Sequence, residues 1–138
     1  MISARSRKSD SLLFVYGTLR SCSASPMALW LRERAVLVGR SRTVGRLYDL
    51  GAYPGMIAPR RKGEWVAGEM YRLLRPRQTL RTLDLYESGS GRGSMPFVRV
   101  RGVVNLDGRA VSAWLYLYQH PTLPRTRIHE GDYGRRVG

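Results

Sequence analysis

The pattern that most limits the fold is a pair of strand-like segments separated by Asp107-Gly108. The segments are "FVRVRGVVNL", residues 97–106, and "AVSAWLYLYQ", residues 110–119. Both are rich in β-branched and aromatic residues, which favour strands. An Asp-Gly pair suits a two-residue hairpin turn, because both of its positions adopt positive φ. The sequence therefore predicts an antiparallel β-hairpin, and the fold must include a sheet.

Strands are expected at three further places. Compact apolar or alternating runs of strand formers occur at residues 12–17, 35–50 and 64–74. Gly17 would stop the first of them. Gly39 and Gly45 either divide the second into two strands or bend a single one.

Two short helices are expected between the strands. Apolar residues at helical spacing, with a proline near the start, predict them at residues 25–34 and from Arg77 to about Glu87. Residues 51–63 are rich in turn formers, and the tail from residue 120 should wrap the surface or fray. This arrangement predicts an α+β fold with a small mixed sheet or barrel.

The chain is long enough for one domain with a real core. It has 138 residues, of which 43% are apolar. We expect a disordered lead at residues 1–11 and a single domain at 12–138. No apolar run approaches the roughly 20 residues that cross a bilayer, and the run after the basic N-terminus is too short for a signal peptide. A soluble, cytoplasmic protein is the expectation.

The formal charge of +14 would ordinarily suggest a nucleic acid or anionic partner. Here 22 of the 24 basic residues are arginine, and they are spread over every segment. A bias in genome composition would produce the same pattern. A solvated basic surface is therefore expected, and nucleic-acid binding is not.

Residues that commonly hold metals or attack substrates are few. Cys22 is the sole cysteine, so no intrachain disulfide or thiolate cluster is possible, and no base lies beside it in the sequence. His120 and His129 are not at a zinc-type spacing. No G-x-S-x-G elbow occurs. The sequence predicts neither a metal site nor a serine hydrolase triad.

Two glycine-containing loops could bind a ligand. "YGTLR", residues 16–20, follows an apolar strand, and its backbone N–H groups could hold a carboxylate or phosphate; an ordinary turn would look the same. "SGSGRGS", residues 88–94, follows a helix and lacks the lysine-hydroxyl pair of a phosphate loop. We interpret the second loop as a mobile lid.

The carboxylates of the second helix are the strongest candidates for chemistry. Leu80, Leu83 and Glu87 share one helix face, so Glu87 points toward the core. A buried carboxylate has a raised pKa, as a general base near neutral pH requires. Asp84 and Glu87 could also act as an acid–base pair. On this pattern alone, Glu87 could equally cap the helix or pair with an arginine.

Several short motifs follow one another along the chain in an order that is informative about its family. The first strand and its loop read "FVYGTLR", residues 14–20, and the second helix ends in "LDLYE", residues 83–87. The others are "GRLYDLGAYPG" at 45–55, "GEMYRL" at 68–73, "FVRVRGVV" at 97–104, "AWLYLY" at 113–118 and "GDY" at 131–133. Almost from end to end, the chain resembles the gamma-glutamylcyclotransferase-like (AIG2-like) family.

The resemblance implies a small mixed β-barrel flanked by short helices, with a cavity at one end. It implies cleavage of a γ-glutamyl amide by the substrate's own α-amine, which releases 5-oxoproline and a free amine without a metal or cofactor. By this resemblance Glu87 is the general acid/base. Tyr16, Gly17, Thr18 and Leu19 form the substrate cradle, and Tyr118 is a candidate for the cavity wall.

Some questions stay open at this level. The segment after Glu87 departs from the family pattern, and Phe97 stands where an aromatic hydroxyl is common, so the part that closes over the leaving amine is in doubt. A non-catalytic module that binds a small molecule is the alternative function. The identity of the leaving amine, the oxyanion-stabilising groups and the oligomeric state are not readable from the sequence.

Overall fold

The computed structural model describes residues 10–88 and 97–134. Residues 1–9 of the expected lead and residues 89–94 of the expected lid lie outside this part. Asp10 and Ser11 are described. The Asp10 carbonyl accepts a hydrogen bond from the Trp114 indole, and the Ser11 carbonyl accepts one from the Leu73 N–H.

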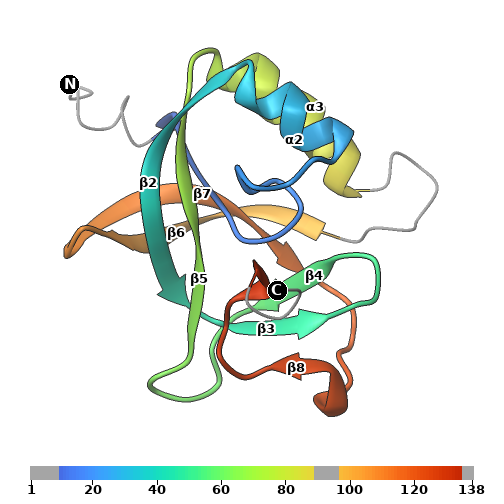
Figure 1. Cartoon of the computed structure of the whole chain (residues 1–138). Helices are drawn as coiled ribbons and strands as arrows, with labels where there is room; N and C mark the ends of the chain where they lie inside the picture. Colours follow the sequence, from blue (N-terminus) through green and yellow to red (C-terminus); the bar gives the residue numbers. More distant parts are fainter. Residues whose placement is uncertain (1–9, 89–96, 135–138) are drawn as a thin grey trace.

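Five strands close into a barrel (Figure 1). In the order of their pairing they are β1 (Leu12–Val15), β5 (Trp65–Leu73), β2 (Ala35–Val44), β6 (Phe97–Leu106) and β7 (Arg109–Tyr118). All neighbours are antiparallel except β1 and β7, which close the barrel in parallel through Leu13 and Trp114. The prediction of a small mixed barrel is confirmed.

The predicted hairpin forms β6 and β7. Asp107 and Gly108 make its turn with φ of 52° and 78°, the positive values that a two-residue turn requires. Residues 35–50 form two strands, one of the two predicted options, because Gly45 separates β2 from the next strand. Strand β2 is itself irregular, with a register shift between Leu37 and Gly39.

A second, three-stranded sheet packs beside the barrel in the order β4-β3-β8. It consists of β3 (Arg46–Asp49), β4 (Pro54–Ile57) and β8 (Arg127–Ile128), with a 3-10 turn, η1 (Pro124–Thr126), before β8. Residues 51–63 are rich in turns, as expected, but they also contain β4, a strand that the sequence did not predict. Its proline is tolerated at the first position of a strand on the sheet edge.

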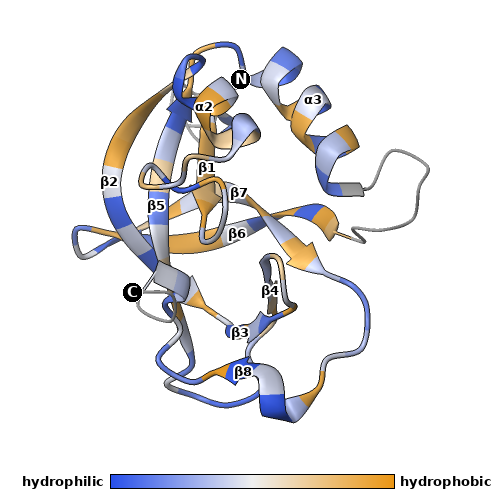
Figure 2. Ribbon diagram, turned by 45° about the vertical axis from the view of Figure 1, so that its right-hand side comes forward, coloured by the Kyte–Doolittle hydropathy of each residue, from blue (hydrophilic) through white to orange (hydrophobic). Residues whose placement is uncertain are grey.

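Both helices lie together at one end of the barrel (Figure 1). They are α2 (Pro26–Arg32), capped by the Ser25 side chain, and α3 (Pro76–Ser88). Apolar and hydrophilic residues alternate along α3 (Figure 2), and Leu80 and Leu83 on its inner face are buried, whereas Leu85 is exposed. The two predicted helices are therefore confirmed.

Strand β1 lies between two halves of the core and is buried on both faces. Leu13 and Val15 pack into the cluster beneath the helices, whereas Phe14 and Tyr16 pack into the cluster shared with the second sheet. This alternation is the two-residue period of a strand. It leaves the end of β1, and the loop that follows, at the junction of barrel, helices and second sheet.

Candidate active site

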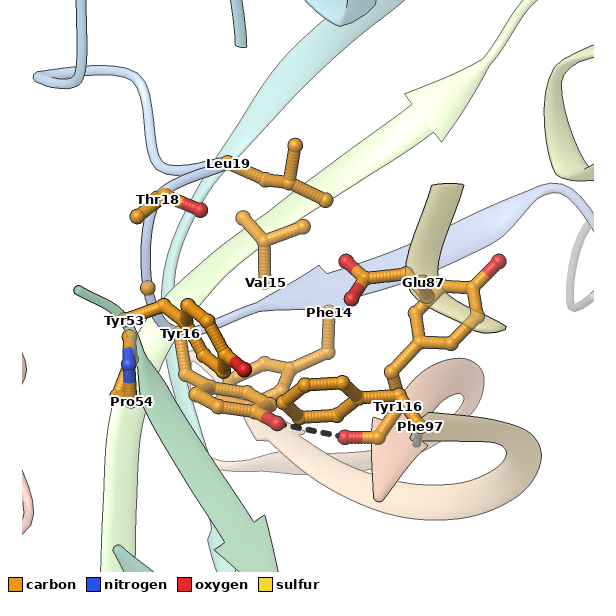
Figure 3. A pocket seen from close by; sticks show the side chains of 11 residues that line it. Phe14, Val15, Tyr16, Thr18, Leu19, Tyr53, Pro54, Glu87, Phe97 and Tyr116 are labelled. Atoms are coloured by element: carbon orange, nitrogen blue, oxygen red, sulfur yellow. Dashed lines mark hydrogen bonds between the residues drawn. The ribbon is translucent and has the colours of Figure 1, made fainter. Parts of the chain in front are cut away.

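A narrow cavity of about 40 Å³ opens at the end of β1. Its wall is assembled from β1 and the following loop, the start of β4, the last turn of α3 and the barrel strands β6 and β7 (Figure 3). The lining residues are Phe14, Val15, Tyr16, Gly17, Thr18, Leu19, Tyr53, Pro54, Glu87, Phe97 and Tyr116. The wall is mostly apolar, and Glu87 supplies its one carboxylate among the described residues.

Glu87 projects into this cavity from the last turn of α3 (Figure 3). It is 9% exposed, and Leu80 and Leu83 on the same helix face are also buried, which confirms the predicted inward orientation. Burial raises the pKa of its carboxyl from 4.5 to about 7. No side chain or backbone group in the described part of the chain hydrogen-bonds to it. The group can therefore exchange a proton near neutral pH.

Asp84, one turn earlier, has a different environment. Arg99 donates two hydrogen bonds to it, from Nε at 2.8 Å and from Nη2 at 3.1 Å, and the Tyr116 hydroxyl donates a third at 2.7 Å. Asp84 does not line the cavity. The Asp84–Glu87 acid–base pair that the spacing allowed is thus not formed, and Asp84 instead fixes Tyr116 in the cavity wall.

The loop after β1 passes unusually close to β4. A Cβ at Gly17 would lie 2.5 Å from Cγ of Pro54, so only glycine permits this approach. The loop turns where the Arg20 N–H donates to the Gly17 carbonyl at 3.0 Å. Within the described residues, no acceptor engages the N–H groups of Gly17, Thr18 or Leu19. Three backbone donors beside the cavity are free for a ligand.

Tyr16 lines the cavity with its ring, while its hydroxyl is occupied by the protein. The hydroxyl donates to the Tyr116 carbonyl at 2.7 Å (Figure 3) and accepts from the Met56 N–H at 3.2 Å. Burial, followed by the nearby charge of Glu87, raises the pKa of Tyr16. Tyr16 therefore stays neutral and joins the barrel to the second sheet.

Tyr118, predicted as a candidate wall residue, lies outside the lining. Its ring packs against Phe97, with centroids 5.4 Å apart, and Phe97 faces the cavity. The structure thus brings together Tyr16, Gly17, Thr18, Leu19 and Glu87, but places Tyr118 behind the wall.

Sequence reasoning missed part of the wall. Tyr53, Pro54 and Tyr116 line the cavity, but they were not proposed as site residues. The motif "GRLYDLGAYPG", residues 45–55, contains the first two and is the sequence signal that could have indicated them. Strand alternation put Tyr116 on the same side as Tyr118, but it could not tell which of them lies nearer the cavity.

Metal ligands and membrane-spanning helices are also relevant to the class of site. Among the described residues, no three His, Cys, Asp or Glu side chains gather where they could hold a metal ion. His120 instead packs on the ring of Tyr118, with centroids 5.8 Å apart. No helix in residues 10–88 or 97–134 is long and apolar enough to span a membrane.

Comparison with known proteins links this geometry to a family. The family model described as "Gamma-glutamyl cyclotransferase, AIG2-like" matches residues 13–135. A Vibrio cholerae serotype O1 protein with a provisional gamma-glutamylcyclotransferase name is 34% identical over 128 residues, which cover 91% of this chain and 97% of that protein. Gamma-glutamylcyclotransferase family protein YtfP of Escherichia coli K12 is 30% identical over 121 residues, or 88% and 94% of the two chains.

A solved structure shares the fold. The crystal structure of an AIG2-like protein from the mouse superposes with a TM-score of 0.68 at 24% identity, covering 89% of this chain and 87% of the mouse chain. The family match spans both the loop after β1 and Glu87. The chain therefore belongs to the gamma-glutamyl cyclotransferase, AIG2-like family.

Proposed function

We propose that the protein cleaves a γ-glutamyl amide by cyclisation, releasing 5-oxoproline and a free amine. The observation that carries the proposal is Glu87, a buried carboxylate with a pKa of about 7 that faces a loop with unpartnered N–H groups. Family membership supports the cyclotransferase class. The substrate's glutamyl end and the role of each residue are what the family resemblance implies, and the geometry of the cavity is compatible with them.

The glutamyl α-carboxylate would bind the N–H groups of Gly17, Thr18 and Leu19. Successive backbone donors in a turn form a concave site for an anion, and they need no cationic side chain. Gly17 lets the loop approach Pro54, so the donors lie beside the cavity. The folded glutamyl chain would then hold its α-amine near its own γ-carbonyl, and the proximity of the two groups supplies much of the rate.

Glu87 would move the proton that the reaction requires. An ammonium cannot attack, so the Glu87 carboxylate first takes a proton from the bound α-ammonium, and the neutral amine nitrogen then bonds to the γ-carbon. When the amide C–N bond breaks, Glu87 gives that proton to the departing nitrogen, and the surplus proton of the attacking nitrogen passes to it by the same carboxylate, so the amine leaves as an ammonium. The substrate is divided into 5-oxoproline and an amine without a water molecule, and Glu87 ends the cycle ionised. A pKa near 7 suits both transfers.

Substitution of Glu87 by glutamine tests this role. Glu87→Gln keeps the size and polarity of the side chain but removes its basicity, so release of 5-oxoproline from γ-glutamyl amines should fall at least about 100-fold. Glu33→Gln is the matched control, because it makes the same change on an exposed side chain of α2's C-cap. Turnover in Glu87→Gln equal to that of the control would refute the proposal.

A panel of substrates would identify the leaving amine and test the alternative function. γ-Glutamyl amines, γ-glutamyl-lysine and glutathione present the same glutamyl end, so 5-oxoproline release is a common readout. If a compound raises the melting temperature but yields no 5-oxoproline at any pH between 6 and 9, the protein is a non-catalytic binding module.

A further inference from the structure

The C-terminal turn, Gly131 to Tyr133, reaches back to the loop that follows β1. Asp132 accepts a hydrogen bond from Nη1 of Arg20 at 2.8 Å, and the two side chains are only 21% and 13% exposed. These residues are 112 positions apart in the sequence. The same Asp132 oxygen also accepts the Gly134 N–H at 2.9 Å, which fixes the orientation of the carboxylate.

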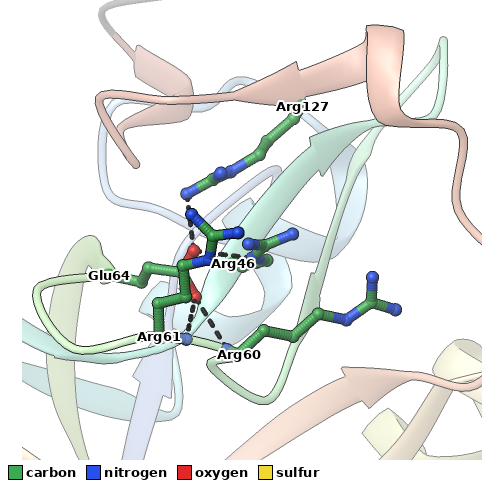
Figure 4. Close-up of polar contacts among 5 residues, drawn as sticks. All are labelled: Arg46, Arg60, Arg61, Glu64 and Arg127. Atoms are coloured by element: carbon green, nitrogen blue, oxygen red, sulfur yellow. Dashed lines mark hydrogen bonds and ion pairs between the residues drawn. The ribbon is translucent and has the colours of Figure 1, made fainter.

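This turn is itself fixed to the body of the fold. The Gly131 carbonyl accepts the Ala67 N–H of β5 at 2.7 Å. Gly131 has φ of 70°, and a Cβ on it would lie 1.9 Å from the Trp65 carbonyl oxygen, so no other residue fits. The strand before it, β8, is held where Arg127 donates to Glu64 at 2.9 Å (Figure 4). Asp132 is therefore presented from a rigid support.

Arg20 connects this support to the backbone of the loop. Its N–H donates to the Gly17 carbonyl at 3.0 Å, and its carbonyl accepts the Ser23 N–H at 3.0 Å. Neither Arg20 nor Asp132 lines the cavity. The Arg20 guanidinium is thus a link between the C-terminal turn and the backbone that presents the N–H groups of residues 17–19.

We infer that Arg20 and Asp132 are a positioning pair that holds the N–H groups of Gly17, Thr18 and Leu19 in place for a carboxylate. The inference rests on the proposed function only in naming that ligand. A loop that must be ordered on binding weakens affinity, whereas one already held in place does not. Loss of the pair should therefore affect substrate binding more than the chemical step.

Asp132→Ala and Arg20→Met break the pair from either side, and methionine keeps most of the buried stem of Arg20. Each should raise KM for a γ-glutamyl amide about three- to tenfold with kcat changed less than about twofold. Adding Arg20→Met to Asp132→Ala should raise KM no further, because Asp132→Ala has already removed the Arg20–Asp132 interaction. Asp10→Ala, which breaks the Arg101–Asp10 ion pair elsewhere on the barrel, is the matched control and should leave KM unchanged.

Amide hydrogen exchange supplies a readout that does not need turnover. The amides of residue 20 and Ser23 close the loop and should exchange faster in Asp132→Ala and Arg20→Met, but not in Asp10→Ala. If wild-type protein releases no 5-oxoproline, the proposed function fails while this exchange test still decides the inference. Unchanged exchange at both amides, additive effects on KM, or a fall in kcat at constant KM would overturn it.

Discussion

The hydroxyl of Tyr16 donates a hydrogen bond to the carbonyl oxygen of Tyr116 at 2.7 Å. It also accepts the Met56 N–H at 3.2 Å, so one buried oxygen joins the end of β1 to β7 and to β4. These three elements come from distant parts of the sequence, and the one hydroxyl joins them beside the cavity. The relationship gives the tyrosine of the "YGTL" motif a structural role beside its place in the wall.

Tyr16→Phe should destabilise the protein and change turnover little. Removal of the hydroxyl leaves the Met56 N–H and the Tyr116 carbonyl without this partner in a buried site, at a cost of about 1–3 kcal/mol in the free energy of unfolding. Urea unfolding at pH 7 measures the loss. Unchanged stability combined with a large fall in kcat would instead show that the hydroxyl acts on the substrate.

Much of the fold was readable from local pattern. The Asp107-Gly108 turn and the alternation around it specify a hairpin without outside help. The four residues of β4 were missed because Pro54 and Gly55 are turn formers, and only pairing with β3 makes them a strand. The two residues of β8 are likewise a strand only through that sheet, a tertiary effect that no local window contains.

The residues of the candidate site likewise fall into those that local pattern predicts and those that only tertiary packing brings together. Helical periodicity alone indicated that Glu87 faces inward with Leu83, because a helix face is a local property. Tyr53 and Tyr116 reach the cavity through sheet packing, which periodicity does not encode. The sequence spacing allows Asp84 to act as a partner of Glu87, and only the structure shows that Arg99 forms an ion pair with Asp84.

Gly17→Ala should lower both stability and turnover, and Pro54→Ala should relieve the effect. The new Cβ would meet Cγ and Cδ of Pro54 at 2.5 and 2.8 Å, and such overpacking costs about 1–3 kcal/mol. Alanine at position 54 removes both ring atoms, so the double variant should be less destabilised than the sum of the two single ones. Gly102→Ala, which would meet only the flexible end of Leu115, is the control. Additive free energies of unfolding would contradict the proposed contact.

Glu64 should contribute to stability above about pH 4.5 and lose that contribution in acid. Burial acts to raise its pKa, but hydrogen bonds from the Arg60 and Arg61 N–H groups and from Arg46 lower it to about 2 (Figure 4). Between pH 4.5 and 2 the Glu64 carboxyl therefore binds a proton in the unfolded chain but not in the folded protein, so the free energy of unfolding decreases as the pH is lowered. The difference in unfolding free energy between wild type and Glu64→Gln should shrink over this range. A constant difference would contradict the lowered pKa.

The pH dependence of turnover should follow the Glu87 carboxyl. The proposed base must be ionised in the free enzyme, so kcat/KM should rise with pH through an apparent pKa of about 7. A substrate whose α-amine has a different pKa should shift the alkaline limb of the profile and leave the acid limb in place. An acid limb near pH 4.5 would mean that Glu87 is not held in an apolar site.

Glu87 should also make the folded protein less stable as pH rises, opposite to Glu64. Its folded-state pKa of about 7 exceeds the ordinary 4.5, so the folded state binds more protons between these values. Its contribution is fully present below pH 4.5 and is lost as pH passes 7, a change of about 3 kcal/mol. Glutamine does not ionise, so the stability of Glu87→Gln should not change in this way. Between pH 4.5 and 8 the free energy of unfolding of Glu87→Gln should therefore rise by about this amount relative to that of wild type, whatever the difference between them at pH 4.5. Urea unfolding of both proteins across this range measures the gain. Parallel stability curves would show that the carboxyl titrates normally and would remove the physical basis for its action as a base near neutral pH.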